Sequence, residues 1–116
     1  MIAKRMNPWD LQRVDKADSL AFQIQAAHPL WQFEREYRFA PPRQYRIDIA
    51  FVLQQLAVEV DGGIFTGGRH VRGAGVLQDC EKTSLLAIHD WRLIRVAPTH
   101  IKSGEALTWI ELALRA

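Results

Sequence analysis

Residues 45–61 read YRIDIAFVLQQLAVEVD, in which two runs carry an apolar residue at every second position. The polar pair Gln54 and Gln55 separates the two runs. A period of two is typical of β-strands, because successive side chains of a strand point to opposite faces of its sheet. We therefore predict two neighbouring strands, each with one apolar face. Those faces comprise Tyr45, Ile47, Ile49 and Phe51 in the first strand and Leu56, Val58 and Val60 in the second.

The segment before these strands predicts a further strand and a helical region. Residues 33–39 also alternate, and a turn at Pro41 and Pro42 connects them to the next strand, so the three strands form a meander. Residues 8–27 have apolar residues at helical spacing after a cap at Asn7, and they form one helix or two. In the strand over residues 33–39, the side chains expected to lie on one face are Phe33, Arg35, Tyr37 and Phe39.

The segment after these strands predicts a helix over residues 76–88, a strand over 91–96 and a helix over 103–114 that is capped by Ser103. The element order is then helix, three strands, helix, strand, helix. This order favours an α/β (α+β) domain with a mixed four-stranded sheet flanked by helices. In the helix over 76–88, the residues expected to face the core are Leu77, Cys80, Leu85 and Ile88.

Length and composition bound the class of protein. A chain of 116 residues is one domain, and 48% hydrophobic with 24% charged residues is ordinary for a globular protein. The lone Cys80 excludes an internal disulfide and indicates a reducing compartment. The first residues do not resemble a signal peptide, and no apolar run approaches the roughly 20 residues that span a bilayer. We expect a soluble cytoplasmic protein without a membrane partner.

Three acidic residues are predicted to meet on the sheet. Glu59 and Asp61 leave the same face of one strand, and Asp48 lies on the neighbouring strand. Carboxylates on neighbouring positions of a sheet repel one another, and a hard divalent cation bound by their oxygen atoms compensates this repulsion. Oxygen ligands alone favour Mg²⁺ or Mn²⁺ over Zn²⁺. The sequence thus indicates a metal site formed by Asp48, Glu59 and Asp61.

The competing interpretation is that these acids line the polar face of a half-exposed sheet. Two features of the sequence weigh against it. The face lacks the Lys, Thr and Gln that usually meet solvent, and the small Ala50 and Ala57 leave space beside the acids. Residues 62–75, which follow Asp61 directly, form a basic loop with six glycines.

Several motifs together resemble a known family. They are RIDIAF at residues 46–51, LAVEVDGG at 56–63, GGRHVRGAG at 67–75, DCEK at 79–82 and WRLIRV at 91–96. In combination they resemble small phage-type endonucleases of the PD-(D/E)XK superfold, which are similar to very short patch repair endonucleases and VRR-NUC domains. The resemblance covers residues 33–114, after an N-terminal helical segment over residues 1–30. It implies a restriction-endonuclease-like αβββαβ core.

The resemblance also implies roles for individual residues. Asp48 is similar to the first acid of the motif and Glu59 to the second, and both would be metal ligands. The superfold usually has a lysine two residues after that glutamate, and Asp61 stands there instead, which puts the charge-stabilising role in doubt. Lys82, on the following helix, could supply the missing ammonium; the alternative is a solvated surface lysine.

Two further residues are similar to catalytic groups of the family. Glu36 resembles an additional acid placed before the motif aspartate, with Glu34 as its rival; either could instead be a plain cross-strand partner of an arginine. His70 resembles a histidine that assists proton transfer after the Asp-Gly step. An ordinary surface histidine is the alternative for His70.

Basic and polar residues near these acids suit phosphate contacts. Arginine side chains bind phosphate oxygens with two parallel hydrogen bonds, and such contacts hold a duplex without reading its sequence. Gln78 lies one turn before Lys82 on the same helix face. The alternative for the loop is a flexible solubilising segment. The candidate nucleic-acid contacts are Arg46, Arg69, Arg72 and Gln78.

Together these features favour a Mg²⁺-dependent endonuclease that hydrolyses phosphodiester bonds in duplex or branched DNA. A nuclease this small often works as a dimer, so a homodimer is a further expectation. Other classes stay open. These are a catalytically inactive DNA-binding module on the same fold, a protein-interaction subunit of a larger assembly, and a sugar hydrolase that uses a carboxyl pair without metal.

Overall fold

The structure, a computed structural model, describes residues 8–61 and 74–115, with side chains from Lys16 onward in the first helix. It is a single α+β domain whose four-stranded mixed sheet is flanked by helices, as the sequence predicts. Residues 8–27 form one helix rather than two. The elements are α1 (Pro8–Ala27), β1 (Glu34–Arg38), β2 (Arg46–Phe51), β3 (Leu56–Val60), α2 (Ala74–Ile88), β4 (Arg92–Val96), α3 (Pro98–Ser103) and α4 (Glu105–Arg115).

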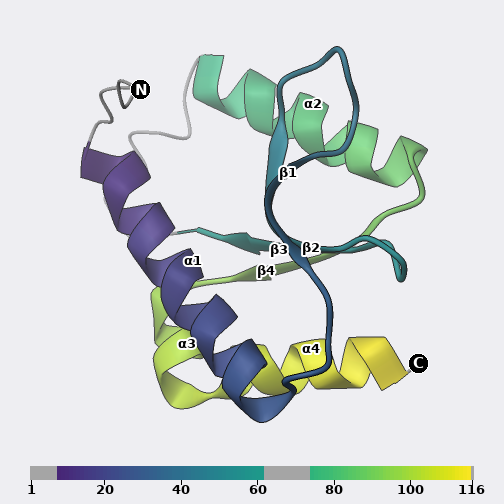
Figure 1. Cartoon of the computed structure of the whole chain (residues 1–116). Helices are drawn as coiled ribbons and strands as arrows, with labels where there is room; N and C mark the ends of the chain where they lie inside the picture. The colour runs from purple at the N-terminus through teal and green to yellow at the C-terminus, as the bar shows by residue number, and fades with distance from the viewer. Residues whose placement is uncertain (1–7, 62–73, 116) are drawn as a thin grey trace, which may run out of the picture.

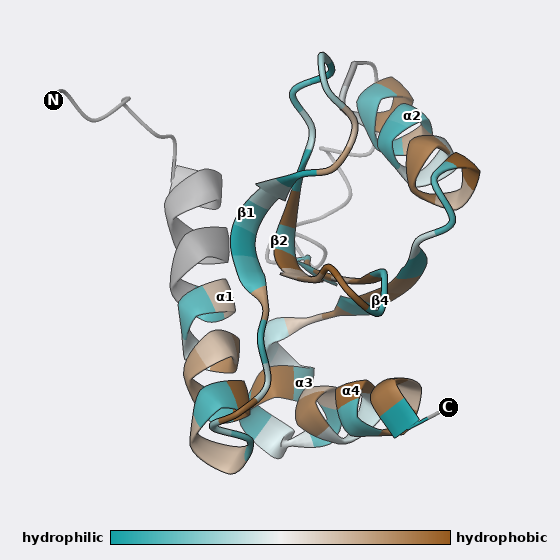
Figure 2. Cartoon of the chain, turned by 45° about the vertical axis from the view of Figure 1, so that its right-hand side comes forward, coloured by the Kyte–Doolittle hydropathy of each residue, from teal (hydrophilic) through white to brown (hydrophobic). Residues whose placement is uncertain are grey.

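The strand order in the sheet is β1-β2-β3-β4. β2 pairs antiparallel with both β1 and β3, and β4 lies parallel to β3, with α2 in the connection between them. Helix α2 covers one face of the sheet, while α1, α3 and α4 lie on the other side (Figure 1). The edge strand β1 is mainly hydrophilic (Figure 2), which protects an open sheet edge from pairing with other chains.

Two apolar clusters hold these layers together. The α1-side core joins α1, α3 and α4 to the sheet, with Ile49, Phe51 and Val58 among its buried residues. The α2-side core joins α2 to the opposite face; its buried members are Phe39, Ala40, Ile47, Ala50, Ala57 and Leu86. Within the part of the chain that the structure describes, no helix is long and apolar enough to cross a membrane.

The predicted faces of β1 and β2 are wrong in one respect. Tyr37 and Ile47, which pair across the two strands, pack in the α2-side core, although Phe33 and Ile49 contact the α1-side core. In β1 the change of face occurs around Glu36, whose φ of 51° is unusual for a non-glycine residue, and in β2 it occurs between Ile47 and Ile49. A residue in this conformation breaks the simple alternation of a strand, and the sequence pattern does not show it.

The predicted core face of α2 is largely wrong. Leu77 and Ile88 are each 71% exposed and Cys80 is exposed. Of the four predicted residues only Leu85, which is half-buried, packs against the α2-side core, and the buried Leu86 was not predicted. Apolar residues lie all around this helix, so periodicity alone does not fix which side meets the sheet. The predicted C-terminal helix over 103–114 is present as α4, which begins at Glu105, and a short helix that was not predicted, α3, precedes it; Gly104, with a left-handed φ of 89°, lies between the two.

Candidate functional site

Asp48 and Glu59 join β2 to β3 through their side chains. The register pairs Ile49 with Val58, which places Asp48 opposite Glu59 at the next level of the sheet. The amide of Val60 donates a 2.8 Å hydrogen bond to Asp48 Oδ2, and the Asp48 amide donates one of 3.1 Å to Glu59 Oε2. Both carboxylates are therefore held in fixed positions by backbone amides.

Burial makes this pair unusual. Asp48 is the one charged side chain that is completely buried among the described residues, with 0% exposure. Taking a carboxylate out of water costs several kcal/mol unless hydrogen bonds and a nearby cation compensate. The Val60 amide supplies part of that compensation. A buried charge in a small domain is a feature expected of functional sites more than of structural cores.

Lys82 brings a positive charge from α2 to the same point. Its Nζ lies 2.6 Å from Glu59 Oε1, and the two side chains are only 18% and 15% exposed. Lys82 is thus not a solvated surface lysine in this structure. Asp48, Glu59 and Lys82 are hereafter the central cluster, which brings two carboxyl groups and one ammonium group to one point of the sheet.

Asp61 is directed to a different partner. Its Oδ2 accepts hydrogen bonds from Arg95 Nε at 2.8 Å and lies 2.7 Å from Arg95 Nη2. Arg95 Nη1 also lies 3.4 Å from Asp79 Oδ2, so this arginine links β4 to the end of β3 and to α2. Burial acts to lower the pKa of Arg95, but the charges of Asp61 and Asp79 outweigh it and the pKa is raised.

The three-carboxylate metal site expected from the sequence is not formed among the described residues. They contain no group of three or more His, Cys, Asp or Glu side chains that could hold a metal ion. Asp48 and Glu59 nevertheless supply carboxylate oxygens, the ligand type that Mg²⁺ prefers, and proteins commonly hold Mg²⁺ with one or two carboxylates while water and phosphate oxygens complete its shell.

The two rival acids of β1 occupy different environments. The register of β1 with β2 runs from Arg35 opposite Ile49 to Tyr37 opposite Ile47, which places Glu36 at the level of Asp48. One carboxylate oxygen of Glu36 is shielded from solvent, whereas Glu34 is exposed. Glu36 is therefore the one of the two that lies level with Asp48 and is partly shielded from solvent.

The predicted DNA contacts are only partly within the described structure. His70, Arg69 and Arg72 lie in residues 62–73, outside the described residues. Arg46 is exposed at the start of β2, and Gln78 is exposed on α2. Their exposure leaves both side chains able to contact a ligand, but the structure does not bring them into the central cluster.

The sequence analysis did not identify a polar cluster of Arg43, Tyr45 and Glu81, hereafter the Glu81 clamp. Glu81 on α2 forms an ion pair with Arg43 and accepts a hydrogen bond from the Tyr45 hydroxyl. The Arg43 guanidinium also lies 5.6 Å from the centre of the Tyr45 ring. Glu81 is 36 positions from Tyr45 in the sequence, so no local pattern could have predicted these contacts.

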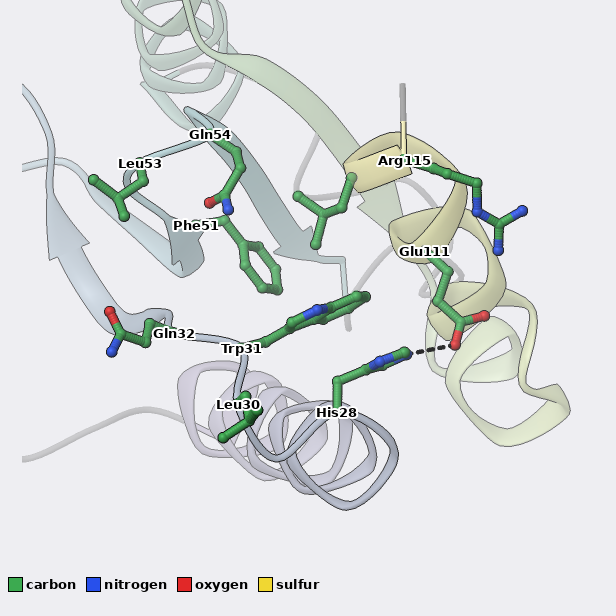
Figure 3. Close-up of a pocket in the computed structure, with 10 residues that line it drawn as sticks. His28, Leu30, Trp31, Gln32, Phe51, Leu53, Gln54, Glu111 and Arg115 are labelled. Carbon is green, nitrogen blue, oxygen red and sulfur yellow. Dashed lines mark hydrogen bonds and ion pairs between the residues drawn. The ribbon is translucent and has the colours of Figure 1, made fainter.

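A cavity of about 480 Å³ opens on the other side of the sheet, between α1, the turn after β2 and α4. His28 stacks on Trp31 with ring centres 3.6 Å apart and lies 2.7 Å from Glu111 (Figure 3). Leu30 and Leu53 at its rim are 91% and 86% exposed. None of the residues predicted from the sequence to form the functional site lines this cavity.

Comparisons of the chain with protein-family models, with curated proteins and with solved structures found no match. The resemblance of residues 33–114 to PD-(D/E)XK nucleases therefore stays a prediction. What the chain does has to be inferred from the chemistry of its own side chains, and the central cluster is the place where buried charge is concentrated.

Proposed function

We propose that this protein is a metal-dependent endodeoxyribonuclease that hydrolyses phosphodiester bonds in duplex or branched DNA. One observation carries the proposal. The fully buried Asp48 is hydrogen-bonded through its own amide to Glu59, and the Lys82 ammonium lies 2.6 Å from that same glutamate. Two carboxylates and a lysine at one point of a sheet are the groups that metal-assisted hydrolysis of a phosphodiester requires.

Asp48 and Glu59 would hold the cation, Mg²⁺ or Mn²⁺. When bound, such an ion lowers the pKa of a coordinated water and polarises a phosphoryl oxygen. The chain's own contribution is orientation, because the amides of Val60 and Asp48 fix the two carboxylates before any ligand arrives. Side chains held by such secondary contacts do not have to reorganise during the reaction.

Lys82 would serve as the charge-stabilising residue that the motif position of Asp61 lacks. In the absence of other cations it neutralises Glu59. Once a divalent ion takes over that role, the ammonium is available to the phosphate oxygens, on which negative charge increases as the P–O bond breaks. The long, flexible lysine side chain permits this exchange without movement of the helix.

DNA is the proposed partner. Arg46 and Gln78 are exposed, and Arg69, Arg72 and His70 in the glycine-rich loop are the further predicted contacts. Contacts of this kind hold the phosphate backbone and make binding dependent on salt concentration. A homodimer is part of the same proposal, because the central clusters of two protomers would each cleave one strand of a duplex.

The experiment that tests the proposal is a nicking assay on supercoiled plasmid DNA and on a branched oligonucleotide. We expect cleavage with Mg²⁺ or Mn²⁺, and none when a chelator is present. Cleavage that continues at full rate with the chelator would contradict the proposed role of the carboxylates. Absence of cleavage with either metal on both substrates would contradict the nuclease proposal itself.

A second function is favoured by one specific observation. Both oxygens of Glu59 already have partners, Lys82 and the Asp48 amide, and Asp61 is held by Arg95. A closed network of this kind suits a DNA-binding module that has the nuclease fold but does not cleave. Binding of duplex DNA that is insensitive to Mg²⁺ and is not followed by nicking would favour the module over the enzyme.

The Asp61→Asn variant should distinguish a structural aspartate from a metal ligand. The asparagine oxygen still accepts from Arg95, and a partly exposed ion pair contributes little, so we expect the nicking rate to fall less than about tenfold. The measurement is the initial rate of plasmid nicking at saturating Mg²⁺. A loss as large as that of Asp48→Asn would instead make Asp61 a ligand, with Arg95 displaced in the active state.

A further inference from the structure

The Glu81 clamp adjoins the central cluster on the same helix. Glu81 and Lys82 are consecutive on α2, and consecutive residues of an α-helix point in directions about 100° apart. Glu81 contacts Arg43 and Tyr45 on the segment between β1 and β2, while Lys82 turns to Glu59 on β3. One turn of α2 is thereby held at two places, by a segment beside the sheet and by the sheet itself.

Apart from these two contacts and the 3.4 Å contact of Asp79 with Arg95, the orientation of helix α2 depends on its apolar face. Leu86 is its one buried residue among those described, and Val76, Lys82 and Leu85 are half-buried. The stability of a helix in a protein comes mainly from packing of an apolar face, and this helix packs only a narrow one. The distance from Lys82 to Glu59 therefore depends on contacts outside the apolar face.

The segment that holds Glu81 is itself well anchored. Phe39 and Ala40 at its start are buried in the α2-side core, and the Arg43 amide donates a 2.8 Å hydrogen bond to the Ala40 carbonyl. Tyr45 at its end is half-buried against the same core. The two side chains that bind Glu81 thus extend from a fixed base, which lets them determine where α2 lies.

We propose that Glu81 is a positioning residue, which holds α2 through Arg43 and Tyr45 so that the Lys82 ammonium reaches Glu59. The catalytic consequence rests on the proposed nuclease function. The positional claim does not, since it concerns a contact between Lys82 and Glu59 that exists with or without activity. The inference therefore has one consequence measurable in the protein alone and a second in DNA cleavage.

The clamp should hold over the whole neutral range of pH. The hydrogen bonds from Arg43 and Tyr45 lower the pKa of Glu81 below its ordinary value of 4.5, so this contribution is lost only as the pH falls through that lowered value. The hydrogen bond to Glu81, together with burial, raises the pKa of Tyr45 above 10.0. The contribution of the tyrosine proton is lost only as the pH rises through that raised value.

The direct test is the rate at which an amine-reactive reagent modifies Lys82, followed by mass spectrometry, with the exposed Lys102 of α3 as internal reference. In Glu81→Gln we expect the Lys82 rate to rise about two- to fivefold relative to Lys102, the range expected for loss of an exposed ion pair. The matched control is Glu105→Gln, which removes an exposed carboxylate on the other side of the sheet and should leave the ratio unchanged.

Two further variants keep the inference falsifiable if Glu81→Gln perturbs folding. Tyr45→Phe removes only the hydroxyl donor and should also raise the Lys82 rate. The exchanged pair Arg43→Glu with Glu81→Arg restores opposite charges in reversed order and should return the rate toward that of the natural chain. An unchanged Lys82 rate in both Glu81→Gln and Tyr45→Phe would overturn the inference, as would failure of the exchanged pair to restore it.

The ultraviolet titration of tyrosine verifies the clamp itself. The difference between the natural chain and Tyr45→Phe isolates the Tyr45 phenol, which should titrate above 10.0 and return toward that value in Glu81→Gln. In the nicking assay, Glu81→Gln should lower kcat two- to fivefold at unchanged KM, in proportion to the Lys82 effect. If the natural chain does not cleave, the nuclease proposal fails while the lysine rates still decide the positional claim.

Discussion

The Asp48→Asn variant is expected to lose DNA cleavage by about 10²–10³-fold or more, because asparagine removes one of the two negative charges that would hold the metal. The substitution is close in shape to the natural side chain. Its amide oxygen can still accept the 2.8 Å hydrogen bond from the Val60 amide, so the link between β2 and β3 is retained. The loss should therefore appear in the chemical step rather than in the fold.

The measurement is the initial rate of plasmid nicking at saturating Mg²⁺, with DNA affinity determined separately by gel shift. Affinity should change little, since phosphate contacts come from basic residues elsewhere. Asp90→Asn is a matched control, because Asp90 is exposed and has a positive φ of 63°, a conformation that asparagine adopts readily. Nicking by Asp48→Asn within tenfold of the natural rate would exclude Asp48 as a metal ligand.

The Lys82→Met variant should also have a large effect, and the size of its effect on stability should depend on whether the metal is present. Methionine keeps the length of the side chain but leaves Glu59 without its ammonium, beside the buried Asp48. Two adjacent carboxylates without a cation repel each other, so without metal we expect the free energy of unfolding to fall by about 1–3 kcal/mol. Millimolar Mg²⁺ should recover that loss, because an ion that binds only the folded state stabilises it.

Cleavage by Lys82→Met is expected to fall about a hundredfold even where Mg²⁺ restores stability, since the ammonium would no longer meet the phosphate charge. Urea unfolding with and without Mg²⁺ gives the stability, and plasmid nicking gives the activity. Lys102→Met, at an exposed position, is the control for loss of one positive charge. A Lys82→Met variant that is stable without metal and still cleaves would contradict the proposed role of Lys82 in stabilising charge on the phosphate.

The strands that carry the central cluster could be predicted from the sequence because their pattern is simple. Alternation over residues 45–61 gives two strands joined by a short turn, and a short turn between antiparallel strands leaves few choices of register. That register places Asp48 level with Glu59. The order of the elements likewise limits the sheet topology, because β3 and β4 with α2 between them form a standard parallel crossover.

The orientation of α2 could not be predicted in the same way. Its apolar residues surround the helix, and a polar residue, Lys82, occupies the side that faces the sheet. A prediction from periodicity places apolar residues in the core, and it therefore placed Leu77 and Ile88 against the sheet. The carboxylate of Glu59 explains the difference, because it forms an ion pair with the Lys82 ammonium on the side of α2 that faces the sheet. An apolar side chain at position 82 would leave the charge of Glu59 uncompensated.

The partners of the remaining acids also lie beyond sequence patterns. Asp61 is held by Arg95, which is 34 positions away, and Glu81 is held by Arg43 and Tyr45 from a different segment. Ion pairs between distant segments depend on the packed geometry, which no local spacing encodes. The alternation of the strand assigned Asp61 to a metal site with Glu59, whereas the structure shows a competing interaction of Asp61 with the Arg95 guanidinium.

The measurement that tests the central claim most directly is the position of Mn²⁺ in crystals of the protein, located by its anomalous scattering. The account predicts a single strong peak at the Asp48 and Glu59 carboxylates, with the Lys82 ammonium withdrawn from Glu59, and loss of that peak in crystals of Asp48→Asn. Full Mn²⁺ occupancy at any other position, or crystals in which Lys82 keeps its contact with Glu59 and no ion binds there, would contradict it.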